Sequence, residues 1–175
     1  MKEEILCAGS GGQGMMLMGK LLAFSGMNAG YNVTWIPSYG AEVRGGTAHS
    51  MVRIQKGKIA DPTVIYPTIC IVMNKPSLAK FAKRVKLNGL LLIDSAQVDS
   101  IPDIKNICIR KAPFTKIAMD MGDKKVANML AVGMLNKVKA LFPLDELVKA
   151  LSFIFKDKPE LISINEKAIR AGYDI

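Results

Sequence analysis

The stretch ILCAGSGGQG (Ile5–Gly14) joins a short apolar run to a turn that contains four glycines. Apolar residues then recur at helical spacing through residues 13–29, and the helix is expected to end at Gly30, which can adopt a positive φ without strain. The next segment, YNVTWI (31–36), is rich in β-formers. This order predicts a strand, a tight turn, a helix and a second strand.

The remaining chain continues the alternation of strands and helices. Residues 47–54 alternate in polarity and predict a strand, which we expect to turn at residues 55–58 into a short return strand. Continuous apolar runs at 68–73 and 89–95 predict strands covered on both faces, and 106–114 predicts another. Helices are predicted at the segments 77–85, 126–142, 144–155 and 159–171. We therefore predict one layered α/β domain over residues 1–175, with a mixed, largely parallel sheet flanked by helices and a helical C-terminal tail.

The net charge limits the classes of partner. The chain has 175 residues and a formal charge of +9, which favours a phosphorylated cofactor, an acidic partner subunit or nucleic acid. The basic clusters at 83–86 and 124–125 are short and aromatic residues are few, so we expect no nucleic-acid binding. No apolar run approaches the ~18 residues of a membrane span, and the acidic N-terminus does not resemble a secretory signal. These features predict a soluble, cytoplasmic protein without a membrane partner.

Metal-binding patterns are absent from the sequence. Cys7, Cys70 and Cys108 lie far apart in apolar stretches, and His49 is the one histidine. We therefore expect buried thiols and no metal ligands, because neither a zinc site nor an iron–sulfur cluster can be assembled from this set.

The glycine turn fits the dinucleotide pattern G-x-G-x-x-G through Gly9, Gly11 and Gly14. A dinucleotide-binding fold also needs a carboxylate about 20 residues after this pattern, at the end of the second strand, to bind the ribose. Here the strand ends in WIPS (35–38), so binding of NAD or FAD is disfavoured. The turn can still direct backbone N–H groups toward a phosphate or carboxylate at the helix N-terminus. The alternative is that the glycines serve only tight packing.

A second glycine-rich segment, PSYGAEVRGGTAHS (37–50), carries Glu42 and Arg44 just before the pair Gly45–Gly46. Arg44 could bind a phosphate or carboxylate with two parallel hydrogen bonds, and the glycine pair would allow a close approach of backbone. A salt bridge on an exposed loop is the alternative interpretation.

Four segments together resemble the gamma subunit of 2-oxoacid:ferredoxin oxidoreductases. They are GSGGQG (9–14), SYGAEVRGGTA (38–48), NMLAVGML (128–135) and NEKAIRAGY (165–173). The resemblance implies a cytoplasmic complex that oxidatively decarboxylates a 2-oxoacid, transfers the acyl group to coenzyme A and reduces ferredoxin. It implies alpha, beta and ferredoxin-like delta subunits as partners. Thiamine diphosphate, Mg²⁺ and the iron–sulfur clusters would lie on those subunits, so this chain would bind no cofactor alone and supply no catalytic or metal-binding residue.

The resemblance also suggests a role in forming the coenzyme A entry. The residues expected at coenzyme A or at a subunit contact are Gly11, Gly12, Gln13, Gly14, Arg44, Gly45 and Gly46. His49 is expected to be a hydrogen-bonded strand residue. The segment SYG-x-E-x-RGGTA is closer to the 2-oxoglutarate and branched-chain types than to pyruvate enzymes, and 2-oxoglutarate is favoured. A stand-alone Rossmann-like NAD(P) reductase and a nucleotide-sensing module remain the alternatives.

Overall fold

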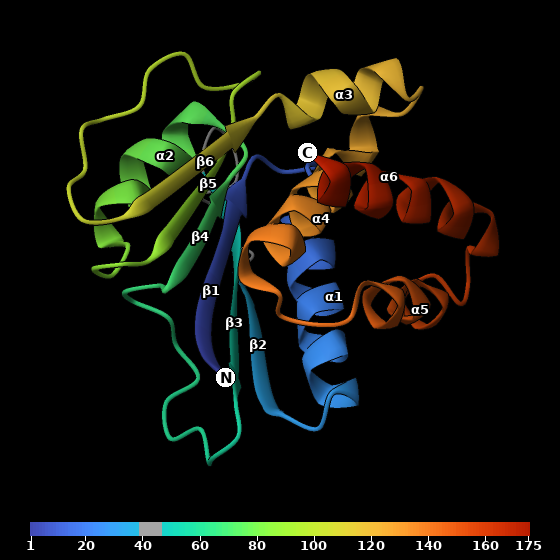
Figure 1. The fold of residues 1–175 in the computed structure, drawn as a ribbon, viewed down its shortest axis with the longest axis horizontal. Helices are drawn as coiled ribbons and strands as arrows, with labels where there is room; N and C mark the ends of the chain where they lie inside the picture. The colour runs from blue at the N-terminus through green and yellow to red at the C-terminus, as the bar shows by residue number, and fades with distance from the viewer. Residues whose placement is uncertain (39–46) are drawn as a thin grey trace.

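The structure, a computed structural model, describes residues 1–38 and 47–175. Over these residues six strands form one sheet in the order β2-β3-β1-β4-β5-β6 (Figure 1). The strands are β1 (Lys2–Gly9), β2 (Asn32–Ser38), β3 (Ala48–Gln55), β4 (Ile69–Val72), β5 (Leu90–Asp94) and β6 (Cys108–Ala112). The strands β1, β4, β5 and β6 are parallel, whereas β3 runs antiparallel to both of its neighbours. The predicted α/β class with a mixed, largely parallel sheet is confirmed.

The strand β3 differs from its prediction in its partners. Its alternation is as predicted, because Ala48, Ser50, Val52 and Ile54 are buried while the residues between them are partly exposed. The predicted return strand after residues 55–58 is wrong. Both edges of β3 are already occupied, by β1 on one side and β2 on the other, so no edge remains for another strand. The chain instead crosses to β4 through residues 56–68.

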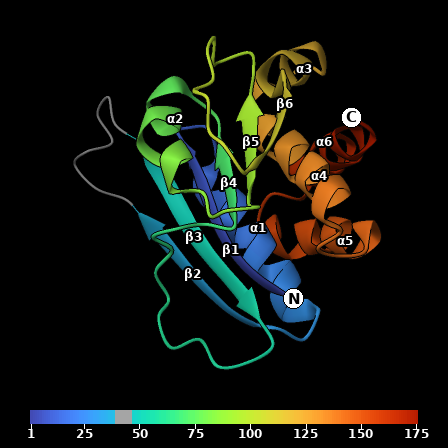
Figure 2. The same cartoon turned by 60° about the vertical axis from the view of Figure 1, so that its left-hand side comes forward.

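Helices cover the two faces of the sheet unequally. The α-helices are α1 (Met15–Asn28), α2 (Lys75–Phe81), α3 (Phe114–Asp120), α4 (Ala127–Lys139), α5 (Leu144–Ile154) and α6 (Ile162–Asp174). Short 3₁₀ segments are η2 (Ala82–Arg84), η3 (Lys124–Val126) and η4 (Pro159–Leu161). Figure 2 shows α1, α4, α5 and α6 on one side of the sheet and α2 on the other. No helix within the described parts of the chain is both long and apolar enough to cross a membrane.

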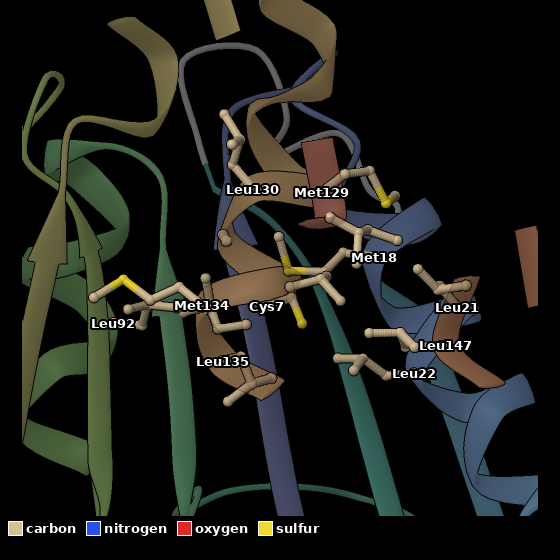
Figure 3. Close-up of a cluster of buried hydrophobic side chains, with 14 of the residues drawn as sticks. Cys7, Met18, Leu21, Leu22, Leu92, Met129, Leu130, Met134, Leu135 and Leu147 are labelled. Carbon is tan, nitrogen blue, oxygen red and sulfur yellow. The ribbon is translucent and has the colours of Figure 1, made fainter. Parts of the chain in front are cut away.

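The larger core lies beneath α4. Side chains of α1, including Met18 and Leu22, form one cluster with Met129 and Leu135 of α4 and Cys7 of β1 (Figure 3). Every residue of α4 from 127 to 136 is buried, because the helix lies between the sheet, α1, α3 and α6. Of the side chains predicted to mark its buried face, Val138 is 37% exposed. A spacing of four residues drifts around a helix of 3.6 residues per turn, which explains this difference.

Two glycines allow α4 and α6 to cross with their backbones in contact. A Cβ atom added to Gly133 would lie 2.0 Å from the carbonyl oxygen of Ile169, and one added to Gly172 would lie 2.0 Å from the carbonyl oxygen of Leu130. Both distances are shorter than any non-bonded contact tolerates. This crossing places the C-terminal helix on α4 and so completes the layer that covers the sheet.

Candidate functional site

A pocket opens where the carboxyl ends of the parallel strands meet. The helix after β1 covers one face of the sheet and the helix after the adjacent β4 covers the other, so the chain leaves a crevice between them. The pocket there has a volume of about 560 Å³. Its lining comes from the segments that follow four strands and comprises Ser10, Gly11, Gly12, Gln13, Met73, Gln97, Thr115, Asp123, Lys124, Lys125 and Ala127.

The glycine turn forms one wall of the pocket. The N–H group of Gln13 donates to the carbonyl of Ser10 at 3.2 Å, and Gly12 has a φ of 86°. This geometry is that of a type II turn, which requires a positive φ at its third residue. The N–H groups of Gly11 and Gly12 have no acceptor among the residues that the structure describes, and both residues are exposed. The turn therefore offers two backbone donors to a ligand in the pocket.

The side chain of Gln13 holds the turn in position through two hydrogen bonds. Its Oε1 accepts a hydrogen bond from the Ser10 N–H at 2.6 Å, and its Nε2 donates to the carbonyl of Met73 at 3.0 Å. Gly9 leaves room for this amide, since a Cβ there would lie 2.6 Å from Oε1. Asn74 adds a donor to the Ser10 hydroxyl at 2.6 Å while its own Oδ1 caps α2. These hydrogen bonds tie the turn to the end of β4.

Gly14 lies behind the pocket wall as the N-cap of α1. It has a φ of 75°, and its carbonyl accepts hydrogen bonds from the N–H of Met18 and from Nδ2 of Asn128, at 2.9 and 3.2 Å. Asn128 is buried in the first turn of α4. The contact therefore fixes the start of α4 against the start of α1, close to the pocket.

A buried carboxylate holds the opposite wall. Asp94, at the end of β5, is fully buried and accepts hydrogen bonds from the N–H and the hydroxyl of Thr115 and from the N–H of Ala96. Three donors compensate the cost of burying this group. Asp94 thereby fixes the position of Thr115, which lines the pocket at the start of α3.

Two lysines give the pocket its positive charge. Lys124 and Lys125 lie on η3, whose first turn is capped by the Asp123 side chain through a 2.9 Å bond to the Lys125 N–H. Both lysines are exposed and line the pocket. In the sequence these two lysines form a short charge cluster with no sign that they belong to the site. They stand more than 110 residues after the turn, and only the parallel arrangement of β1, β5 and β6 brings them near it.

The predicted site residues fall into three groups in the structure. Gly11, Gly12 and Gln13 line the pocket, and Gly14 supports it from behind. Arg44, Gly45 and Gly46 lie outside the described residues. His49 lies on β3, with Nδ1 3.4 Å from the Thr47 carbonyl oxygen and its ring 5.1 Å from that of Phe81.

The thiols are placed for packing. Cys7 and Cys70 are buried, whereas Cys108 is half-buried and departs from its prediction. Burial raises the pKa of Cys7 to about 12 and outweighs a hydrogen bond from Ser50 that lowers it. Burial likewise raises the pKa of Cys70, with a smaller contribution from Cys7. In the described part of the chain, no three His, Cys, Asp or Glu side chains come together in a way that could hold a metal ion.

The fold and the pocket define the class as an open α/β domain with a crevice at its topological switch point, lined by Lys124, Lys125 and Asp123 among others. The chain belongs to the family described as pyruvate ferredoxin/flavodoxin oxidoreductase, which it matches over residues 4–175.

Individual relatives agree with this assignment. The ketoisovalerate oxidoreductase subunit VorA of Methanothermobacter marburgensis is 35% identical over 98% of this chain and 36% of its own length. The 2-oxoglutarate synthase subunit KorC of Methanocaldococcus jannaschii is 31% identical over 86% of this chain and 82% of its own. The chain thus spans about a third of the ketoisovalerate relative.

A solved structure supports the fold. The gamma subunit of a keto/oxoacid ferredoxin oxidoreductase from Geobacter sulfurreducens superimposes with a TM-score of 0.84 and 28% identity. The match covers 98% of this chain and 96% of that one.

Proposed function

We propose that this chain is the gamma subunit of a 2-oxoacid:ferredoxin oxidoreductase. The complex would oxidatively decarboxylate a 2-oxoacid to an acyl-CoA and reduce ferredoxin in the cytoplasm. Support comes from the family match over residues 4–175 and from the gamma-subunit structure that this chain covers almost completely. Alpha, beta and ferredoxin-like delta subunits would complete the assembly and hold thiamine diphosphate, Mg²⁺ and the iron–sulfur clusters.

We favour 2-oxoglutarate as the substrate, with a branched-chain 2-oxoacid as the alternative. The relatives at 31% and 35% identity are named for 2-oxoglutarate and ketoisovalerate, while a pyruvate synthase subunit PorC from Thermotoga maritima is 27% identical. Viologen reduction by the purified complex with each 2-oxoacid and coenzyme A would rank the three substrates by kcat/KM. A higher kcat/KM for pyruvate or for the branched-chain 2-oxoacid than for 2-oxoglutarate would overturn this preference.

We further propose that the pocket holds phosphate groups of coenzyme A. The molecule carries a pyrophosphate and a 3′-phosphate, and the pocket offers what such anions require. Gly11 and Gly12 line it with backbone N–H groups that have no acceptor among the described residues, and Lys124 and Lys125 line it with positive charge. Gln13 and Gly14 would hold the turn in shape, and Arg44, Gly45 and Gly46 would add further contacts. The single observation that carries this role is the convergence of the glycine turn and the two lysines on one cavity.

The test is kinetic and uses the assembled complex. The double variant Lys124→Ala/Lys125→Ala should raise KM for coenzyme A about tenfold, because it removes two exposed charge contacts worth at most about 1 kcal/mol each, and should leave kcat unchanged. Lys156→Ala/Lys158→Ala is the matched control, since these lysines are exposed between α5 and α6. Arg44→Ala tests the second glycine segment separately. An unchanged KM in the first variant would exclude the pocket as the phosphate site.

The topology argues against the NAD(P) reductase alternative. In a dinucleotide fold the carboxylate that binds ribose stands at the end of the strand adjacent to β1. Here β3 runs antiparallel between β1 and β2, so the end of β2 lies two strands, or about 10 Å, from the turn. Oxidation of NAD(P)H by the purified chain with an added substrate would favour the reductase instead. Tight binding of a free nucleotide without any effect on the complex would favour a sensing module.

A further inference from the structure

The face of the sheet opposite α4 carries a groove that the proposed function does not use. It lies between the helical segment α2–η2 and the loop after β5, with a volume of about 400 Å³. Its lining comprises Lys75, Leu78, Ala79, Ala82, Lys83, Ser100, Ile101 and Pro102. Figure 2 shows α2 on the outer side of the sheet, away from α1, α4, α5 and α6.

The helical wall of the groove has an ordered pattern. Its lining positions are 75, 78, 79, 82 and 83, which form one stripe along a helix. The middle of the stripe is apolar, through Leu78, Ala79 and Ala82, and a lysine stands at each end. Eight residues of helix separate Lys75 from Lys83, a rise of roughly 12 Å. Ile101 and Pro102 supply an apolar wall on the other side.

The helical wall of the groove is basic, whereas the loop opposite it carries the carboxylates Asp99 and Asp103. Residues 75–86 contain five Lys or Arg side chains and no carboxylate. Lys83 and Arg84 are exposed, and the Arg84 guanidinium lies 5.4 Å from the centre of the Phe81 ring. Lys86 is paired with the buried carboxylate of Glu4. The helix therefore presents a concentrated positive field around an apolar centre.

The ion pair at one end of the groove is weak. Lys75 Nζ lies 3.5 Å from Oδ2 of Asp99, and the two side chains are 65% and 87% exposed. Exposed pairs of this kind contribute at most about 1 kcal/mol, because water and salt screen them. A carboxylate of a bound partner could therefore replace Asp99 at little cost.

We propose that this groove binds an acidic segment of a partner protein. The segment would place an aliphatic side chain against Ala79, Ile101 and Pro102, which are partly or fully exposed, and a carboxylate near each of Lys75 and Lys83. Charge complementarity selects the sign of the partner, and the apolar floor distinguishes a peptide from a nucleic acid. Single-stranded nucleic acids stack their bases on aromatic side chains, and the described lining of this groove contains no aromatic residue.

The experiment measures binding of a defined peptide to the full chain by fluorescence anisotropy. The labelled probe is a helical peptide with one leucine and a glutamate one turn before and after it; a second peptide has lysines in place of the glutamates. The charge-reversal variant Lys75→Glu/Lys83→Glu should weaken binding of the acidic probe at least tenfold. Lys156→Glu/Lys158→Glu carries the same change of net charge elsewhere and should weaken it less than threefold. Thermal unfolding of each variant would confirm that it is folded.

A neutral substitution tests the apolar part of the proposal. Ala79 is exposed, so Ala79→Trp fills the groove without changing charge and should also weaken binding at least tenfold. If the two charge-reversal variants weakened binding equally, the peptide would be bound by net charge alone and the proposal would be overturned. Binding that Ala79→Trp leaves unchanged would overturn it as well. Tighter, groove-dependent binding of a labelled thymidine oligonucleotide would overturn it in favour of nucleic acid. The KM for coenzyme A in the complex should be unchanged in both groove variants, which separates this site from the pocket.

Discussion

Glycines have two different roles where α4 packs against other segments, the turn near its start and the helix α6 at its middle. Near its start, the turn Ser10–Gly14 carries Gly12 in open space, where an added Cβ would meet nothing within 4 Å. At its middle, Gly133 and Gly172 stand where an added Cβ would lie 2.0 Å from a backbone carbonyl. The first glycine is needed for its positive φ and leaves amides accessible to a ligand. Gly133 and Gly172 are needed because a larger side chain would overlap the backbone of the facing helix, and their own backbone groups are not accessible to a ligand.

The comparison shows how to separate a binding glycine from a packing glycine. A packing glycine is surrounded by protein, so its replacement changes the free energy of unfolding. A binding glycine borders a cavity, so its replacement changes affinity more than stability. Gly14 lies between the two types, since it has a φ of 75° and also touches Asn128.

The largest effect is expected at the helix crossing. Gly133→Val should destabilise the chain by about 4 kcal/mol or more, because α6 cannot move away without exposing the core. Urea unfolding followed by circular dichroism would measure the change. Gly57→Ala is the matched control, since Gly57 has open space around it and should change stability by less than about 0.5 kcal/mol. A Gly133→Val chain as stable as the control would show that the crossing is not tightly packed.

A smaller effect is expected at Gly14. Gly14→Ala should cost about 2–3 kcal/mol, from a strained positive φ and from a Cβ that would lie 2.2 Å from Nδ2 of Asn128. In an Asn128→Ala background the same substitution should cost only the strain, about 1 kcal/mol. A double-mutant cycle of unfolding free energies measures the difference. Additive effects would mean that Asn128 and Gly14 do not interact.

Cys7 of β1, the strand that leads into the turn, should make the chain less stable at alkaline pH. The expected loss of stability lies between those expected at Gly14 and at Gly12. The pKa of Cys7 is raised to about 12 from its ordinary value of 9.0, so the unfolded thiol ionises first as pH rises. Stability should be unaffected below pH 9 and should fall above it, by about 1.4 kcal/mol for this group at pH 10. Urea unfolding at pH 7 and pH 10 would measure the fall. Cys7→Ala should show a shallower fall than the parent chain, and an equal fall would assign the effect to other groups.

The smallest effect is expected at Gly12. Gly12→Ala introduces a strained positive φ without any clash, so it should cost about 1 kcal/mol of stability. Its larger consequence should be a higher KM for coenzyme A in the assembled complex. Thermal unfolding and steady-state kinetics on the same preparation would compare the two. A variant that loses stability as Gly133→Val does would remove the distinction between the two glycine contacts.

Local sequence patterns predicted the elements but not their neighbours. The strands β4, β5 and β3 were correctly predicted from the apolar runs at 68–73 and 89–95 and the alternation at 47–54. The residues of a strand themselves indicate which of its faces are buried. The position of β3 between β1 and β2 was missed, since pairing depends on segments far apart in sequence. Lys124 and Lys125 were missed as site residues for the same reason. Gly133 and Gly172 gave no sign of their contact, because a glycine in a helix pattern does not reveal what lies opposite it.

The most direct test of the central claim is hydrogen–deuterium exchange of the assembled complex with and without coenzyme A. Coenzyme A is expected to slow exchange in peptides containing Ser10–Gln13 and in peptides containing Lys124–Lys125. Peptides from α6 at the Gly133–Gly172 crossing should exchange at an unchanged rate. Unchanged exchange at both walls of the pocket, under saturating coenzyme A, would contradict the account.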